Sequence, residues 1–149
     1  MTDPRQPQEL GILLFVANRA LEQRAFDAVV AAGITDITLA QARIAARIAP
    51  NGSRVSDLAE QARVTKQSAA SLVEQLEKAG YVERVPDPTD GRARLVRVAP
   101  RAQRVAEVAN EEVVRVLAEW ADRVGERRLQ QLHEILSDLR AITDPWWHS

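Results

Sequence analysis

The chain has 149 residues, and a single domain of this length buries about 70% of the surface that its unfolded form exposes. It contains no cysteine, which excludes disulfides, thiolate metal sites and thiol-based redox chemistry. The formal net charge is -1, but residues 43–104 hold 12 Lys and Arg against 7 Asp and Glu, so a basic middle lies between acidic ends.

The N-terminal segment predicts an amphipathic helix over residues 9–32, ended by Gly33. Its apolar residues recur every three or four positions, at Leu10, Leu14, Ala17, Leu21 and Ala25. Thr38 is placed to cap a second helix that runs to about residue 48. The longest apolar stretch, residues 12–17, is too short to span a bilayer and has acidic flanks where a secretory signal is basic, so we expect a cytoplasmic protein.

Two further helices are predicted inside the basic segment. Ser56 is a good N-cap for a helix of about two turns, with acidic residues in its first turn. Thr65 then caps a longer helix that runs to Ala79, and Gly80 suits the left-handed position that follows a helix. One face of this longer helix is apolar and the other is polar.

A β-hairpin is expected next. Residues 81–85 and 94–98 are apolar or β-branched runs, and the Asp-Pro and Asp-Gly signals between them predict a charged loop over residues 86–93. A loop longer than the usual two to five residues tends to be functional. The order of short helix, longer helix and hairpin predicts a helix-turn-helix followed by a wing.

Two more amphipathic helices complete the chain, one from about Pro100 to Gly125 and one to about residue 143. With the first helix they leave apolar stripes to cover, which favours pairing with a second chain over packing as a monomer. The fold class is therefore mainly α with a small β-hairpin wing, in one domain over residues 1–149. Trp146 and Trp147, beside Pro145, either dock onto the dimer or lie free at the terminus.

The longer helix of the basic segment has the chemistry for reading DNA. If it enters the major groove N-terminus first, four polar side chains reach base edges or phosphates: Lys66, Gln67, Ser68 and Ser71. Gln67 is the best candidate for a base contact, because Gln pairs bidentately with adenine. Lys66 suits phosphate, and the two serines discriminate poorly between bases.

The chain resembles the MarR family, the multiple-antibiotic-resistance regulators, over two stretches in the right order and separation. They are Leu76-Glu77-Lys78-Ala79-Gly80-Tyr81-Val82-Glu83-Arg84 and Asp87-Pro88-Thr89-Asp90-Gly91-Arg92. The residue-level match lies within residues 56–98, and helix order extends the resemblance over the whole chain. The sequence departs from the family after the wing, where Val98-Ala99-Pro100 replaces a common Leu-Thr.

The resemblance implies a DNA-binding part over residues 38–98, flanked by dimerisation helices over residues 9–32 and 100–143. It implies a homodimer on a pseudo-palindromic operator, acting as a repressor relieved by a small effector. Arg92 would enter the minor groove, Asp90 would orient Arg92 by a charge-assisted hydrogen bond, and Arg94 would contact phosphate. Thr65 would begin the recognition helix and be one of the DNA-binding residues.

The resemblance also implies a crevice for a small aromatic or anionic effector. Four side chains are candidates for it, although packing or plain exposure is the more common role for each: Phe15, Arg43, Asn110 and Trp120. Such a ligand would act by favouring one spacing of the two recognition helices over another.

Nothing in the sequence predicts an enzyme or a cofactor. The histidines, His133 and His148, have no ligand-spaced partner, and no nucleophile elbow or phosphate-binding glycine loop is present. Two alternatives to a DNA-binding regulator stay open: a protein-interaction module that keeps the winged fold, and a small-molecule binding protein or enzyme that uses the crevice.

Overall fold

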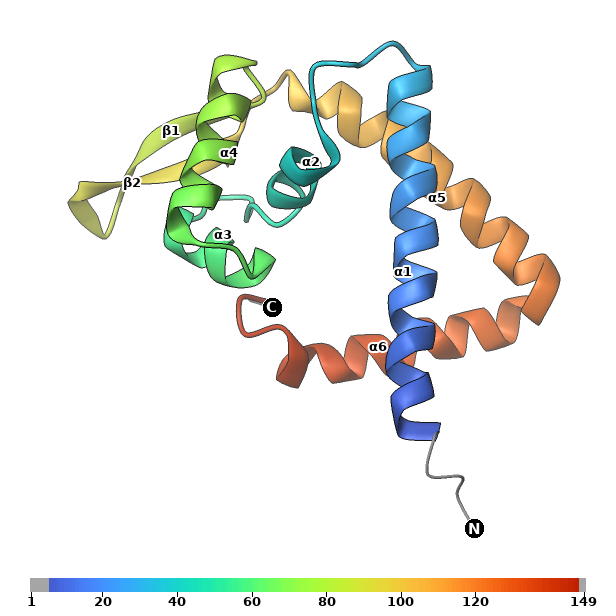
Figure 1. Cartoon of the computed structure of the whole chain (residues 1–149). Helices are drawn as coiled ribbons and strands as arrows, with labels where there is room; N and C mark the ends of the chain where they lie inside the picture. Colours follow the sequence, from blue (N-terminus) through green and yellow to red (C-terminus); the bar gives the residue numbers. More distant parts are fainter. Residues whose placement is uncertain (1–5, 148–149) are drawn as a thin grey trace. The chain divides into compact units, whose positions relative to one another are not determined.

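The computed structural model describes residues 6–147, so His148 lies outside the described residues. These residues form six α-helices and one two-stranded antiparallel sheet (Figure 1). The elements in chain order are α1 (Gln6–Ala31), α2 (Leu39–Ala45), α3 (Val55–Ala62), α4 (Lys66–Lys78), β1 (Val82–Asp87), β2 (Asp90–Val98), α5 (Ala102–Val124) and α6 (Glu126–Thr143). The chain divides into two compact units, one over Gly33–Glu107 and one made of the helical segments that precede and follow it in the sequence.

The unit Gly33–Glu107, called here the winged unit, is built around one apolar core. Its largest fully buried side chains come from α2, α3, α4 and β2, and they are Ile44, Leu58, Val73, Leu76 and Val96. Helix α4 packs against α2, α3 and β1. The face of α4 that carries Ala69, Val73 and Leu76 is therefore committed to the core, which leaves the opposite face to solvent.

The predicted helix signals of the winged unit are mostly confirmed. Thr38 caps α2 through a reciprocal capping box with Gln41, and the Thr65 side chain accepts a hydrogen bond from the backbone amide of Ser68 at the start of α4. Gly80 follows α4 with a φ of +82°, as a left-handed residue after a helix requires. The Ser56 cap is wrong: the N-cap of α3 is Arg54, two residues earlier, and Arg54 makes no side-chain capping bond.

The wing differs from its prediction. The expected eight-residue loop is wrong, because β1 continues to Asp87 and β2 begins at Asp90. Strand pairing runs in register from Val82↔Val98 to Pro86↔Arg94, and the register then shifts between Pro86 and Asp87. The predicted turn is present, but most of the residues expected in the loop belong to the two strands, and the shift in register accommodates them. At its base the hairpin also pairs with Ser53, which exchanges two backbone hydrogen bonds of 2.8 Å with Val96.

The second unit holds α1, most of α5, and α6. The guanidinium of Arg24 in α1 donates hydrogen bonds to Glu112 and Glu119 in α5, with N–O distances of 2.8 Å and 2.7 Å for the two ion pairs, so these bonds connect α1 to α5. Both helix boundaries move slightly from prediction: α1 begins at Gln6, and α5 begins at Ala102 after a turn that contains Pro100. Within residues 6–147, no helix is apolar over enough of its length to cross a membrane.

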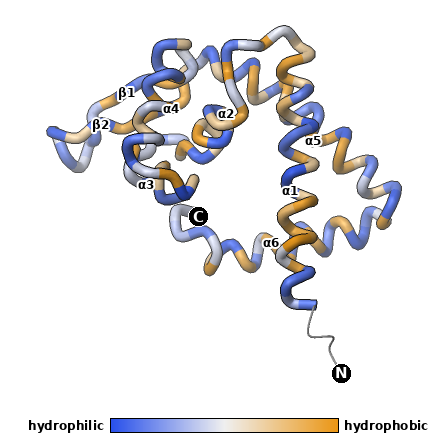
Figure 2. Tube along the Cα trace, in the orientation of Figure 1, coloured by the Kyte–Doolittle hydropathy of each residue, from blue (hydrophilic) through white to orange (hydrophobic). Residues whose placement is uncertain are grey.

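Large apolar side chains of this second unit lie exposed to solvent. Six large apolar side chains in the first half of α1 are 45–64% exposed, namely Leu10, Ile12, Leu13, Leu14, Phe15 and Val16. Figure 2 shows hydrophobic residues along this half of the helix. Helix α6 has no buried residue, and its exposed apolar side chains are Leu132, Ile135, Leu136, Leu139 and Ile142. Large exposed apolar surfaces on folded domains commonly mark interaction sites.

Candidate nucleic-acid interface

The N-terminal end of α4 is polar, exposed and without acidic residues. Thr65, Lys66, Gln67, Ser68 and Ser71 are all exposed, and the first turn contains no Asp or Glu. Helix N-termini carry a partial positive charge that acidic side chains usually neutralise. Here Lys66 adds to that charge, so the end of the helix favours an anionic partner outside the chain.

The hydroxyl groups at this end already have partners. Thr65 Oγ1 accepts from the backbone N–H of Ser68 at 3.0 Å and donates to Ser68 Oγ at 2.8 Å. Ser68 thus forms part of the cap of α4. Neither Lys66 nor Gln67 makes a side-chain hydrogen bond or ion pair with any described residue, which leaves the donors of both and the Gln67 carbonyl to an external partner.

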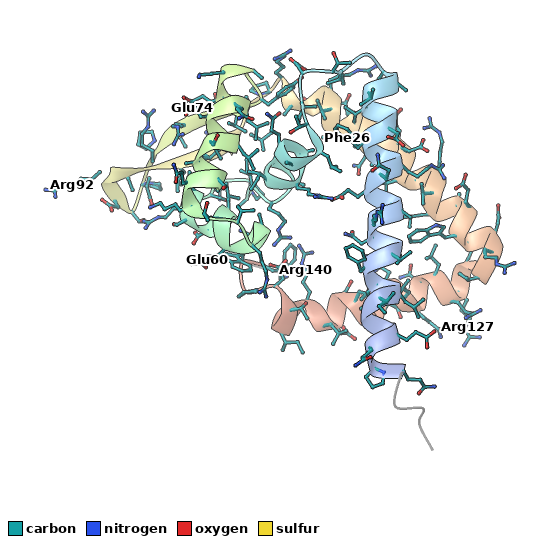
Figure 3. The ribbon with its side chains drawn as sticks, in the orientation of Figure 1. Phe26, Glu60, Glu74, Arg92, Arg127 and Arg140 are labelled. Carbon is teal, nitrogen blue, oxygen red and sulfur yellow. The ribbon has the colours of Figure 1, made fainter. Side chains whose placement is uncertain are left out.

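Arg92 lies near the turn of the hairpin and extends away from the strands (Figure 3). It is exposed, and no other part of residues 6–147 provides it with an ion-pair partner. The implied bond from Asp90 to its guanidinium is corrected by the structure. Asp90 Oδ1 instead accepts from the backbone N–H of Arg92 at 3.1 Å, because the two residues form a local Asx-type turn.

Arg94 is anchored to the opposite strand. Its Nη2 donates to the carbonyl oxygen of Arg84 at 3.2 Å, and the residue is exposed on the wing. Arg84 in turn pairs with Glu77 of α4 at 2.9 Å, which connects the hairpin to this helix. The guanidinium of Arg94 therefore has a fixed position on the wing, and its phosphate contact stays a prediction.

Asp87 is a structural residue of the wing that the sequence did not single out. It is 5% exposed, and its Oδ1 accepts from the hydroxyl of Thr89 at 2.7 Å and from the Thr89 backbone amide at 2.8 Å. Its Oδ2 accepts from Arg54 Nη2 at 2.8 Å and from Arg54 Nε at 3.2 Å. Thr89 first, and then Arg54, lower the pKa of Asp87 to about 2. The Asp-x-Thr spacing was a visible signal for the Thr89 bonds, whereas nothing local indicated Arg54.

A second cluster fixes the far end of α4. Arg101 stacks over the Tyr81 ring at 4.5 Å and donates to the carbonyl oxygen of Ala79, while the Tyr81 hydroxyl donates to Asp36. The Tyr81 bond, and then Arg101, lower the pKa of Asp36. Burial, and then the bond to Asp36, raise the pKa of Tyr81. Three segments of the winged unit therefore meet just after α4.

The four effector candidates come from both units. Phe15 is exposed on α1, and Asn110 and Trp120 lie on α5, exposed and half-buried respectively. Arg43 is exposed on α2 in the winged unit. Their assembly into one site stays a prediction.

Known proteins resemble this chain in both sequence and fold. Residues 35–93 match the MarR family. The HTH-type transcriptional regulator FarR of Neisseria gonorrhoeae is 30% identical over 110 residues, which cover 73% of this chain and 75% of FarR. The chain belongs to the MarR family. This MarR family member is accordingly a transcriptional regulator and not an enzyme.

Three further proteins resemble this MarR family member in sequence or in fold. The transcriptional activatory protein BadR of Rhodopseudomonas palustris is 31% identical over 99 residues, 63% of this chain and 57% of BadR. The structure of NadR in complex with 4-hydroxyphenylacetate is 28% identical with a TM-score of 0.66, covering 87% of this chain and 91% of NadR. The structure of CouR from Rhodococcus jostii RHA1 bound to p-coumaroyl-CoA covers 99% of this chain and 100% of CouR, with a TM-score of 0.67 at 18% identity, and shows the same winged helix fold.

Proposed function

We propose that this MarR family member binds double-stranded DNA in a sequence-specific way through α4 and the wing. The observation that carries the proposal is the distribution of cations without partners. Lys66 at the N-terminus of α4 and Arg92 on the wing are both exposed, and no described residue pairs with either. A helix N-terminus without acidic residues in its first turn and a hairpin turn that both present exposed, unpaired cations favour a polyanionic partner.

In this proposal α4 enters the major groove with its N-terminus first. Its buried face is held by the core, so the exposed residues Gln67 and Ser71 meet base edges while Lys66 meets a phosphate. Arg92 occupies the adjacent minor groove, where a narrow A·T-rich segment attracts a guanidinium. Such a regulator acts in the cytoplasm, where bacterial DNA lies.

We also infer that two copies pair through the outer helices. The exposed apolar residues of α1 and α6 supply the surface, because burial of apolar area contributes about 25 cal/mol per Å². A two-fold axis would place two α4 helices and two wings on one DNA site, so the operator is expected to be pseudo-palindromic with half-sites about one helical turn apart.

The regulator is proposed to act as a repressor that a small aromatic or anionic effector relieves. The complex of NadR with 4-hydroxyphenylacetate, at 28% identity, supports an aromatic acid as the class of effector. BadR carries the description of an activatory protein, so the sign of regulation needs its own measurement. Deletion of the gene with readout of the operator-linked transcript separates the two, since loss of a repressor raises expression and loss of an activator lowers it.

The decisive experiment is a selection of bound fragments from genomic DNA, followed by titration of the enriched duplex at fixed salt. We expect enrichment of a pseudo-palindrome with an A·T-rich step on each side. An unrelated duplex of equal length is the control, and specific binding should be at least about 1000-fold tighter. A failure to enrich any sequence would contradict the proposal and favour a protein-interaction module with a winged fold.

A further inference from the structure

The wing hairpin is irregular at the point that carries Arg92. Five pairs, from Val82↔Val98 to Pro86↔Arg94, follow regular antiparallel register, and the next pair is Asp87↔Asp90. Residues 91–93 of β2 therefore lie between two registered pairs without a registered partner opposite them. The position of Arg92 is consequently not set by the strand ladder, and another interaction has to hold this part of the wing.

The ion pair between Arg54 and Asp87 lies at this irregularity. Arg54 precedes α3, the first helix of the helix-turn-helix, and Asp87 ends β1. Two guanidinium nitrogens of Arg54 donate to the same Oδ2 of Asp87, at 2.8 Å and 3.2 Å. The carboxylate is almost fully buried, whereas the Arg54 side chain is 47% exposed. The bond thus joins the distal half of the hairpin to the helix-turn-helix.

The other oxygen of Asp87 orders the turn itself. Oδ1 accepts the amide and the hydroxyl of Thr89, and one residue further along Asp90 accepts the amide of Arg92. An isolated two-stranded hairpin is at best marginally stable in water. The bridge between Ser53 and Val96 holds the base of the hairpin, and the Asp87 bonds hold its distal half.

We propose that Arg54 and Asp87 are positioning residues for the wing, and that their ion pair orients Arg92 toward the minor groove before DNA binds. The inference rests on the proposed function. Ordering a free hairpin tip on binding costs conformational entropy, so a tip that is already ordered binds more tightly. Neither Arg54 nor Asp87 needs to touch the DNA for this effect.

A double-mutant cycle between Arg54→Met and Arg92→Ala tests the proposal on the operator duplex. Arg92→Ala in the wild-type chain should weaken binding roughly 5- to 150-fold, the range of a good groove contact. In the Arg54→Met chain the same substitution should weaken binding less than about threefold, because the guanidinium is no longer held in place. An equal loss in both backgrounds would overturn the inference.

Arg97→Met is the matched control. Arg97 lies in the regular part of β2, its side chain is also 47% exposed, and it pairs with Glu83 at 2.6 Å. Loss of this ion pair removes one arginine from the same hairpin without touching the irregularity. The effect of Arg92→Ala should therefore keep its full size in the Arg97→Met chain, and a reduction there as large as that with Arg54→Met would show a general charge effect and overturn the proposal.

Asp87→Asn distinguishes a positioning role of Arg54 from a direct contact between Arg54 and a DNA phosphate. This variant frees the guanidinium, so affinity should fall if the ion pair positions the wing, and should stay equal or rise if Arg54 binds phosphate itself. Hydrogen exchange of the free protein gives a readout without DNA. We expect faster exchange at the Thr89 and Arg92 amides in both Arg54→Met and Asp87→Asn, with the Val96 amide unchanged as the internal reference.

Two failures are distinguishable. If the wild-type chain binds no duplex specifically, both the proposed function and this inference are wrong. If the wild-type chain binds and Arg92→Ala weakens binding equally in every background, the proposed function stands and the positioning role of Arg54 and Asp87 is wrong. Circular dichroism on each variant ensures that the folded protein is compared, and Asp87→Asn supplies the cycle if Arg54→Met does not fold.

Discussion

Arg101 Nη2 lies 2.8 Å from Asp36 Oδ2, so the segment that precedes α5 is tied to the segment that precedes α2. Tyr81, which is 3% exposed, completes this cluster from the end of α4 by donating its hydroxyl to the other Asp36 oxygen. The C-terminal end of α4 is therefore held by side chains from distant parts of the chain, since Asp36 lies 45 residues from Tyr81 and 65 residues from Arg101.

Tyr81→Phe should reduce the free energy of unfolding by about 1–2 kcal/mol, because a partly buried hydrogen bond to a carboxylate is lost while the ring packing stays. Urea unfolding followed by circular dichroism measures the change. Ser71→Ala, which removes an exposed hydroxyl of α4, is the control and should change stability by less than about 0.5 kcal/mol. Equal effects of the two substitutions would show that the Tyr81 hydroxyl contributes nothing.

Protonation of Asp87 should occur far below the ordinary aspartate range. Its folded-state pKa is about 2, so the stability contributed by its bonds is present above the ordinary pKa of about 4 and is lost as pH falls toward 2. The chemical shift of the Thr89 amide, measured in the folded protein across this range, should titrate with a midpoint near 2. The Asp87→Asn variant should lack the transition, and a midpoint near 4 in the wild-type chain would contradict the bonding described.

The backbone at Arg63 predicts a stabilising substitution. Arg63 ends α3 with a φ of 53°, a left-handed conformation that costs a side-chain-bearing residue energy. Arg63→Gly should therefore raise the free energy of unfolding by about 1 kcal/mol. The reverse substitution at a matched site, Gly80→Ala at φ +82°, should lower it by about 1 kcal/mol, since an added Cβ meets only ordinary contacts there and the strain is in the backbone.

Lys66 should contribute to DNA affinity through phosphate. Lys66→Ala should weaken binding to all duplexes about equally and reduce the slope of log affinity against log salt by about 1. Lys78→Ala is the matched control on the same helix, because Lys78 lies at the opposite end of α4 and pairs with Glu74 at 3.3 Å. A slope that changes equally in both variants would refute a specific role for the N-terminus of α4.

The dimer proposal predicts a defect from a charge on α6. Ile135→Glu places a carboxylate among exposed apolar residues, and the dimer dissociation constant should rise at least about tenfold because that charge must be desolvated. Sedimentation velocity over a range of protein concentrations measures the change. Val64→Glu, at an exposed apolar position of the winged unit, should leave association unchanged. A wild-type chain that sediments as a monomer at every concentration would contradict the dimer proposal.

Local signals in the sequence were enough for most helices of the winged unit. Thr38 and Thr65 cap their helices through bonds to residues three positions away, and Gly80 adopts the backbone conformation that glycine favours. These interactions depend on neighbours along the chain, so the sequence shows both partners. The helix-turn-helix, the wing and the exposed site on α4 could be predicted for this reason.

The tertiary structure decided where the wing is fixed. Arg54 reaches Asp87 across 33 residues, and neither residue type indicates the other from a distance. The Asp87 bonds order the turn where the strands continue and a long loop was expected. The start of α3 after Arg54 instead of Ser56 involves no side-chain capping bond, so no local signal indicated it. By itself the sequence determined most of the helices and the exposed polar face of α4, since those follow from periodicity and capping. The hairpin register and the buried carboxylate that orders it depend on packing between distant segments, which only the folded chain brings together.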